Sequence, residues 1–336
     1  MALVGAGCAV ALVAAVLCGL AIGPTPIQPT RIAGALLAGI GLGHSTLSPL
    51  ASTIVWQIRA PRMVLGLLVG AMLAVAGGTY QGVFRNPLAD PYLLGVAAGA
   101  GLGATIAIAD VGGGLTTPSW TPALAFVGAL VAVALTWAVG GRGLHSGTST
   151  LILAGVAVAS LLTSAQTYLQ QRASTDSLAR VYIWLLGSLA SASWHSVVLV
   201  VPYVVVCAVV CVAAGRALDV MSVGESESRS LGLPVARVRL IVIVASSLGT
   251  AAVVSVAGLI GFVGIIVPHL IRLLAGTSYR RILPLSVVAG AAFLVLCDTV
   301  ARTVMAPSEL PLGVVTAVVG APVFVLVLSL RRRVVV

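Results

Sequence analysis

Long apolar stretches separated by short polar islands make up most of this chain. Ten such runs lie near residues 2–23, 63–84, 92–109, 120–140, 149–170, 194–215, 238–257, 258–275, 283–303 and 312–330. A helix needs about 20 mainly apolar residues to cross a bilayer, and most of the runs have this length. The pattern predicts an all-α membrane protein with about ten transmembrane helices. Residues 31–43 and 181–189 are predicted to form partial helices rather than spans.

The seventh and eighth runs form one long apolar stretch that is interrupted by Gly258, Gly261, Gly264 and Pro268. We expect a break between two helices there. Irregular backbone at membrane depth is tolerated beside a cavity or a protein neighbour.

Composition agrees with a membrane location and narrows the chemistry. Of the 336 residues, 60% are hydrophobic and 8% are charged, whereas soluble domains carry about 25% charged residues. All 18 basic residues are arginine. Without a lysine the chain has no P-loop lysine, so it is not itself a Walker-type ATPase. The five cysteines lie in apolar stretches without a CxxC pair, which favours packing roles and predicts no bound metal or cofactor.

The arginines also predict orientation. When they are assigned to alternate loops, twelve fall on the side of both termini and six on the other side. Arginine-rich short loops stay cytoplasmic, so we predict that both termini are inside. The arginines are scattered between apolar runs instead of clustering beside aromatic side chains, which argues against nucleic-acid binding.

Three arginines are exceptions to this orientation rule. Arg59 and Arg62 flank Pro61 where the second helix is expected to begin at the outer surface, and Arg302 reaches the same surface four residues after Asp298. Two interpretations remain open. The arginines extend to the membrane interface, or they form an exposed cationic site for an acidic partner.

Two features are expected at the opposite surface. Residues 216–239 form the largest polar island, predicted as one or two short helices joined by a turn, and they are either a solvated loop or a docking site for another protein. Residues 81–95 contain Pro87 and Pro91 and predict a rigid turn between helices. This turn is a simple connection, or it presents Asn86 and Leu88 toward a pathway.

Several blocks together carry a resemblance to a known family. They are RAPRM and GGTYQGVFRNPLADPYLLGVAAGAGLG within residues 59–103, LILAGVAVASL at 151–161, WLLGSL at 184–189, GESESRSLGLP at 224–234, and longer blocks at 258–286 and 298–328. In this order the chain resembles the FecCD-type permeases, the membrane subunits of type II ABC importers for iron chelates and cobalamin. The resemblance covers nearly the whole chain.

The resemblance implies a single transmembrane permease domain over residues 1–336, in the cytoplasmic membrane of a bacterium, without catalytic residues. It implies a second permease subunit, identical or closely related, two cytoplasmic ATPase subunits that bind ATP and Mg, and an extracytoplasmic binding protein. The implied site residues fall into three groups: Arg59, Arg62 and Arg302 for docking of the binding protein; Gly224, Glu225, Leu231, Gly232 and Pro234 for coupling to the ATPase; and Asn86, Leu88, Ser149 and Thr150 for a cytoplasmic gate.

Ferric siderophore, haem and cobalamin permeases share these motifs. We expect a ferric siderophore as cargo because it is the commonest cargo of the family. The alternative from another class is an ion-coupled secondary transporter, which generally needs ionisable residues deep in the membrane. Asp298 is the one acidic residue clearly inside a predicted span. The four histidines lie far apart in the sequence, which argues against an enzyme.

Overall fold

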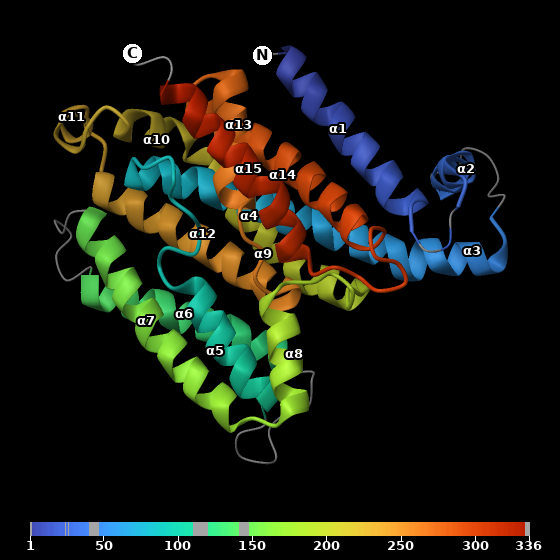
Figure 1. Ribbon diagram of the computed structural model, residues 1–336. Coiled ribbons are helices and arrows are strands. Elements are labelled where there is room, and N and C mark those ends of the chain that lie inside the picture. Colours follow the sequence, from blue (N-terminus) through green and yellow to red (C-terminus); the bar gives the residue numbers. More distant parts are fainter. Residues whose placement is uncertain are drawn as a thin grey trace.

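Helices account for every regular element that the computed structural model describes, over residues 2–23, 25, 27–39, 47–109, 120–140 and 148–332 (Figure 1). In chain order they are α1 (Ala2–Ala21), α2 (Pro29–Gly39), α3 (Pro49–Thr53), the π-helix η1 (Ile54–Arg59), α4 (Ala60–Phe84), α5 (Val96–Ala109), α6 (Thr121–Gly140), α7 (Thr148–Arg172), α8 (Thr175–Leu185), α9 (Trp194–Ala213), α10 (Gly215–Met221), α11 (Glu225–Ser230), α12 (Val235–Ala257), α13 (Val263–Ala275), α14 (Tyr279–Ala301) and α15 (Leu312–Arg332).

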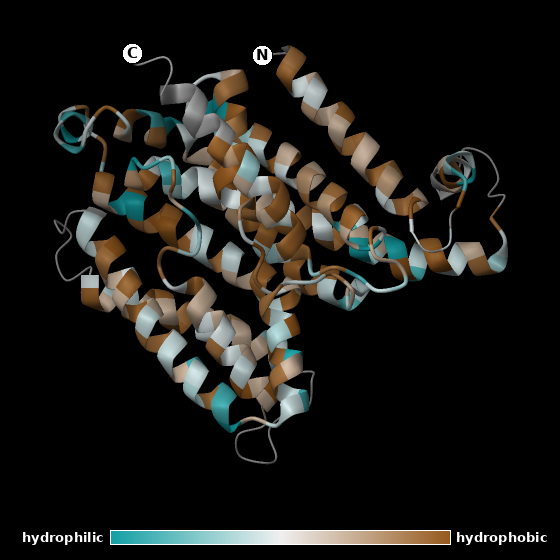
Figure 2. Cartoon of the chain, viewed as in Figure 1, coloured by the Kyte–Doolittle hydropathy of each residue, from teal (hydrophilic) through white to brown (hydrophobic). Residues whose placement is uncertain are grey.

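Each of the ten apolar runs forms a helix in this structure. Seven segments of the described residues are long and apolar enough to cross a membrane, and α5, α13 and residues 312–325 of α15 are shorter apolar helices. Hydrophobic residues run along the helices, while the most hydrophilic residues gather near helix ends and connections (Figure 2). The chain is therefore a multi-pass membrane protein. The predicted partial helices correspond to α2 and α8.

The second helix begins earlier than its sequence suggests. Residues 49–84 form one apolar helical segment of 36 residues, in which α3, η1 and α4 follow one another without a break. Pro61 therefore lies within a helix instead of starting one. A proline removes one backbone donor, and the wider turn of the π-helix just before it relieves the usual clash with the preceding turn.

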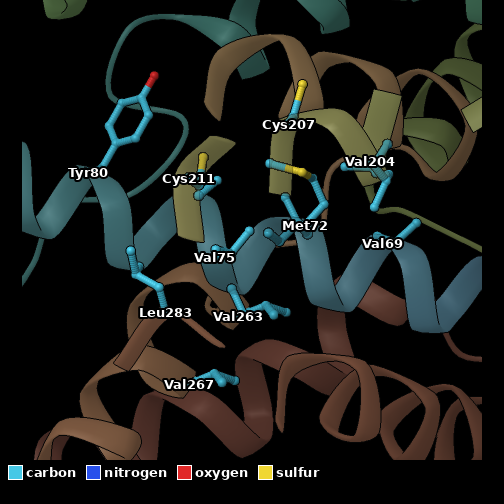
Figure 3. Packing of buried hydrophobic residues seen from close by; sticks show 14 of the residues in the cluster. Val69, Met72, Val75, Tyr80, Val204, Cys207, Cys211, Val263, Val267 and Leu283 are labelled. Carbon is cyan, nitrogen blue, oxygen red and sulfur yellow. The ribbon is translucent and has the colours of Figure 1, made fainter. Parts of the chain in front are cut away.

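Helix α4 lies at the centre of the bundle and is buried along most of its length. Its apolar side chains Val69, Met72 and Val75 pack against residues of α9 and α13, among them Cys207 and Val263 (Figure 3). Helix α4 also crosses α14 at a very short distance. A Cβ atom on Gly70 would lie 2.2 Å from the carbonyl oxygen of Gly290. Small residues at such crossings let two membrane helices approach closely.

The break between α12 and α13 is tied to distant parts of the chain. The hydroxyl of Tyr92 donates a hydrogen bond to the carbonyl of Ile260 (3.0 Å) and accepts one from its amide (3.2 Å). The amide of Ser188 donates to the carbonyl of Ala257, and the amide of Leu312 donates to the carbonyl of Gly187. These bonds satisfy backbone groups that the break leaves free. The predicted interruption is confirmed.

The helices define two opposite ends of the molecule. Helix α4 runs from Arg62 to Gly82, which packs against Leu218 of α10, and α14 runs back from Tyr279 to Asp298. We call the end with Arg59, Arg62 and Arg302 the arginine end, and the other the α10–α11 end. In Figure 1, α10 and α11 lie far from α3, which continues into the arginine end.

Candidate functional site

At the arginine end, Arg62 binds two carboxylates. Its Nε and Nη2 atoms donate to the carboxylate of Asp298 at 2.8–3.1 Å. Its Nη1 and Nη2 atoms donate to the carboxylate of Glu309 at 2.8 and 2.9 Å. Both contacts use the planar, two-pronged geometry that suits a guanidinium and a carboxylate. Asp298 is buried, whereas the Glu309 side chain is 35% exposed.

Arg59 and Arg302 bind the end of α1 instead. Nη1 of Arg59 donates to the carbonyls of Leu20 (2.7 Å) and Ala21 (3.0 Å). Nη2 of Arg302 donates to the carbonyl of Gly19. The last carbonyls of a helix have no partner within the helix and carry partial negative charge, so arginines there are favourable. Arg302 also lies 3.7 Å from Asp298.

The three arginines are buried, and this corrects the expectation of an exposed cationic site. Arg59, Arg62 and Arg302 are 3%, 9% and 5% exposed. Arg59 and Arg62 also point to different neighbours, α1 and α14, rather than forming one exposed pair. The sequence does not show this burial, because it depends on residues as far away as Gly19 and Glu309.

The charges of this site do not balance. Three guanidiniums, of Arg59, Arg62 and Arg302, face two carboxylates, of Asp298 and Glu309, so the group has a net charge of 3 − 2 = +1. Glu309 lies in the exposed connection after α14. Another acidic group could replace Glu309 on Arg62 without disturbing the buried pair with Asp298.

At the opposite end, residues 216–239 form α10 and α11 and the start of α12, as predicted. Gly224 begins the turn into α11 with φ of 154°, and a Cβ atom there would lie 1.9 Å from the Glu227 carboxylate. Glycine is needed because side chains rarely adopt this backbone conformation. The hydroxyl of Ser228 also donates to the carbonyl of Val220 (2.9 Å), which fixes α11 against α10.

Glu225 anchors α11 to α12 through its ion pair with Arg239, and it also pairs with Arg229 within α11. Its carboxylate accepts hydrogen bonds from Arg239 (2.8 Å) and Arg229 (2.7 Å). The hydrogen bond from Arg239, with the charges of both arginines, lowers the pKa of Glu225. The carboxylate therefore stays ionised at neutral pH.

Beyond these ion pairs, the tip of the segment is apolar and exposed. Leu231 is 71% exposed and Val223 is 68% exposed, with Gly232 and Pro234 exposed beside them. Exposed apolar side chains at a polar helix connection are characteristic of a protein contact.

A contact between α10 and the start of α14 has no direct signal in the sequence. Asp219 of α10 accepts hydrogen bonds from the hydroxyl of Ser278 (2.7 Å) and from the amide of Tyr279. Asp219 thereby caps α14, the helix whose other end carries Asp298. The spacing of 59 and 60 residues carries no local signal for this pairing. A serine just before a long apolar helix was the available indication.

The predicted gate residues lie at the α10–α11 end but do not bond to one another. The side-chain oxygen of Asn86 accepts from the amide of Leu88 (2.9 Å), which forms the rigid turn, and Leu88 is 46% exposed. Ser149 and Thr150 are exposed in the first turn of α7. Among the described residues no hydrogen bond joins the two pairs.

A pocket of about 500 Å³ lies between this turn and α7, lined by residues that include Asp90, Tyr92, Ser160 and Thr163. The amide of Tyr92 donates to Asp90 (2.8 Å), and burial raises the pKa of the Asp90 carboxyl to about 6. Beyond the pocket, the exposed side of α7 also carries Ser164 and Thr167. A membrane helix with exposed hydroxyl groups is typical of a face that meets protein or water.

Within the described part of the chain, no three His, Cys, Asp or Glu side chains could together hold a metal ion. The five cysteines are free, and Cys207, Cys211 and Cys297 are buried, as expected of packing residues.

Comparison with known proteins gives consistent matches over almost the whole chain. The FecCD transport family matches residues 11–330. An uncharacterized ABC transporter permease protein, YvrB of Bacillus subtilis, is 41% identical over 88% of this chain and 84% of its own length. The cobalamin import system permease protein BtuC of Halobacterium salinarum is 43% identical over 84% of this chain and 75% of its own. An inward-facing metal-chelate type ABC transporter superposes with a TM-score of 0.86, at 28% identity, over 98% of this chain and 99% of that one.

Proposed function

The chain belongs to the FecCD transport family, and on that premise we propose that it is the permease subunit of an ATP-driven importer for a metal chelate or cobalamin. The observation that carries this proposal is the agreement between fold and family over the full length, at a TM-score of 0.86 to a metal-chelate type ABC transporter. In this proposal residues 1–336 act as one transmembrane permease domain with both termini in the cytoplasm.

Energy for transport then comes from another chain. This sequence has no lysine for a P-loop, so two cytoplasmic ATPase subunits bind ATP and Mg. Their docking surface is the α10–α11 end, formed by Gly224, Glu225, Leu231, Gly232 and Pro234. The exposed Leu231 supports this role, and so does the Glu225–Arg239 ion pair that holds α11 on α12. A rigid, apolar-tipped projection transmits motion better than a mobile loop.

The arginine end then faces the outside and receives the binding protein. Arg59, Arg62 and Arg302 provide a net positive charge beneath the surface. An acidic residue of the binding protein would replace Glu309 on the exposed edge of Arg62. The docking contact is therefore an exchange of carboxylates, because the Nε donor, both Nη2 donors and one Nη1 donor of Arg62 already bind Asp298 and Glu309.

The cargo pathway lies along the exposed face of α7, between this chain and a second permease subunit. Ser149 and Thr150 at the start of α7, with Asn86 and Leu88 on the neighbouring turn, form the gate at the cytoplasmic end. The support is the row of exposed serine and threonine residues on α7, because small hydroxyl residues are enriched where membrane helices meet other protein.

Two cargoes are candidates. A ferric siderophore is the expectation from the sequence. Of the two, we favour cobalamin as the cargo, because the relative at 43% identity is named as a cobalamin permease.

The test is uptake by liposomes that contain the chain with its ATPase and binding protein. We expect ATP-dependent accumulation of cyanocobalamin that a ferric hydroxamate siderophore does not match; the reverse preference would make the siderophore the cargo. Uptake without the ATPase, driven by an ion gradient, would instead identify an ion-coupled secondary transporter.

A further inference from the structure

An apolar groove of about 510 Å³ lies between α1, α13 and α14. It is lined by residues of all three helices, including Gly7 and Cys8, Leu274, Ala289, Phe293 and Leu296. These helices are apolar segments of a membrane protein, so the groove opens toward lipid. It is separate from the sites described above, and its occupant does not depend on the cargo.

The groove exists because α1 packs closely on α14 near the arginine end and less closely toward its N-terminus, where Val4 and Cys8 are only partly buried. Near the arginine end, Ala15 is buried with Ala292 and Val295, and a Cβ atom on Gly19 would lie 3.0 Å from Val295. Toward the other end, a Cβ atom on the groove residue Gly7 would meet nothing within 4 Å. Helix α1 thus diverges from the bundle toward its N-terminus (Figure 1).

An arginine stands at the open end of the groove. Arg281 precedes the groove residues Ala289, Ala292 and Leu296 by 8, 11 and 15 positions, which places it on the same face of α14. Arg281 is exposed, and its side chain forms no ion pair or hydrogen bond with any described residue. A free cation therefore lies where the apolar groove meets the membrane surface.

The dimensions suit one leaflet of a bilayer. The 15 residues from Arg281 to Leu296 rise about 22 Å along the helix axis. Half of a bilayer, headgroups included, measures about 20–22 Å.

We propose that the groove binds one anionic phospholipid, with an acyl chain between α1 and α14 and the phosphodiester on Arg281. Charge complementarity selects an anionic headgroup over a zwitterionic one, because an arginine near the surface attracts anionic lipid. The bound chain would fill the space that α1 leaves and hold its free half against the bundle.

Native mass spectrometry of the purified full chain tests this proposal, with dioleoylphosphatidylglycerol and dioleoylphosphatidylcholine as probes. We expect one phosphatidylglycerol to bind more tightly than phosphatidylcholine. Gly7→Phe, which fills the groove, should abolish this binding, and Arg281→Gln should weaken it about fivefold. Two matched controls should bind as the wild type does: Gly5→Phe, two residues from Gly7 and outside the groove lining, and Arg237→Gln, an exposed arginine at the start of α12.

Equal binding of the two lipids, or no effect of Arg281→Gln, would overturn the proposed headgroup contact. Equal loss in Gly5→Phe and Gly7→Phe would overturn the proposed groove. Thermal unfolding of each variant shows whether it is folded, and the Arg281→Gln result stands even if Gly7→Phe does not fold.

Discussion

Arg62 in the first turn of α4 donates three hydrogen bonds to the carboxylate of Asp298, 236 residues away near the end of α14. The pair lies at the arginine end of the closely packed α4 and α14, which also cross at Gly70 and Gly290. At the other end of α14, Asp219 of α10 caps the first turn. One buried helix thus contacts both proposed docking surfaces, and its two ends are held by carboxylates.

The first prediction concerns stability. Arg62→Gln leaves the buried carboxylate of Asp298 without its main partner, which costs about 3–5 kcal/mol in comparable buried pairs. We expect a large loss in the free energy of unfolding, measured in mixed detergent micelles. Arg237→Gln removes an exposed arginine and should change it by less than about 0.5 kcal/mol.

A double variant separates lost charge from lost packing. Arg62→Gln with Asp298→Asn leaves no unpaired buried carboxylate, although Arg302 loses its ion-pair partner. Because Arg302 still donates to the carbonyl of Gly19, we expect the double variant to be more stable than Arg62→Gln alone. If Arg62→Gln unfolds like the wild type and like the Arg237→Gln control, the buried pair does not stabilise the bundle.

The second prediction concerns docking. Glu309→Gln weakens the intramolecular competitor for Arg62 while keeping every arginine. An exposed ion pair contributes up to about 1 kcal/mol, so we expect the loaded binding protein to bind up to about fivefold more tightly. Surface plasmon resonance on the purified complex measures this, with Glu227→Gln at the opposite end as the control. Unchanged or weaker binding in Glu309→Gln would show that docking does not use this edge of Arg62.

The third prediction concerns coupling. Glu225→Arg breaks both ion pairs of Glu225 and places three arginines together. We expect the rate of transport-coupled ATP hydrolysis to fall at least about fivefold. This factor corresponds to about 1 kcal/mol, the lower end of typical coupling free energies between two sites. Glu227→Arg makes the same charge change on the same helix, where Glu227 accepts a hydrogen bond from Ser226 and forms no ion pair with a described residue. Equal effects of the two variants would mean that surface charge, rather than the anchoring of α11, controls coupling.

The fourth prediction concerns pH. Burial raises the pKa of Asp90 from 3.8 to about 6, so the folded state holds this proton at a pH where the unfolded state has lost it. Stability of the wild type should therefore fall as pH rises from about 4 to 6 and stay level above. Over this range the free energy of unfolding of the wild type should fall by roughly 3 kcal/mol relative to that of Asp90→Asn.

Unfolding of the wild type and Asp90→Asn at pH 4.5, 5.5 and 7 measures this difference. The control is Asp176→Asn, an exposed acid at the start of α8, which should run parallel to the wild type. A constant difference between the wild type and Asp90→Asn across this range would contradict a raised pKa for Asp90.

The positions of the helices could be predicted because they depend on local composition. A run of about 20 apolar residues is favourable in lipid only as a helix, whatever it packs against. The break at Gly258 followed from glycine in the same way, since that residue adopts φ of 71°. The start of the second helix could not be read locally. Pro61 normally marks a helix start, and here a π-helical turn carries the helix through it.

The sequence by itself determined that this chain crosses a membrane many times, that it has no lysine for ATP hydrolysis, and which short blocks carry its family resemblance. Only the tertiary structure decided that Arg59, Arg62 and Arg302 are buried, and that Asp219 caps α14. The physical reason is distance along the chain. Apolar periodicity reports how each helix meets its surroundings, whereas the partners of a buried charge come from helices that folding brings together across as many as 283 residues.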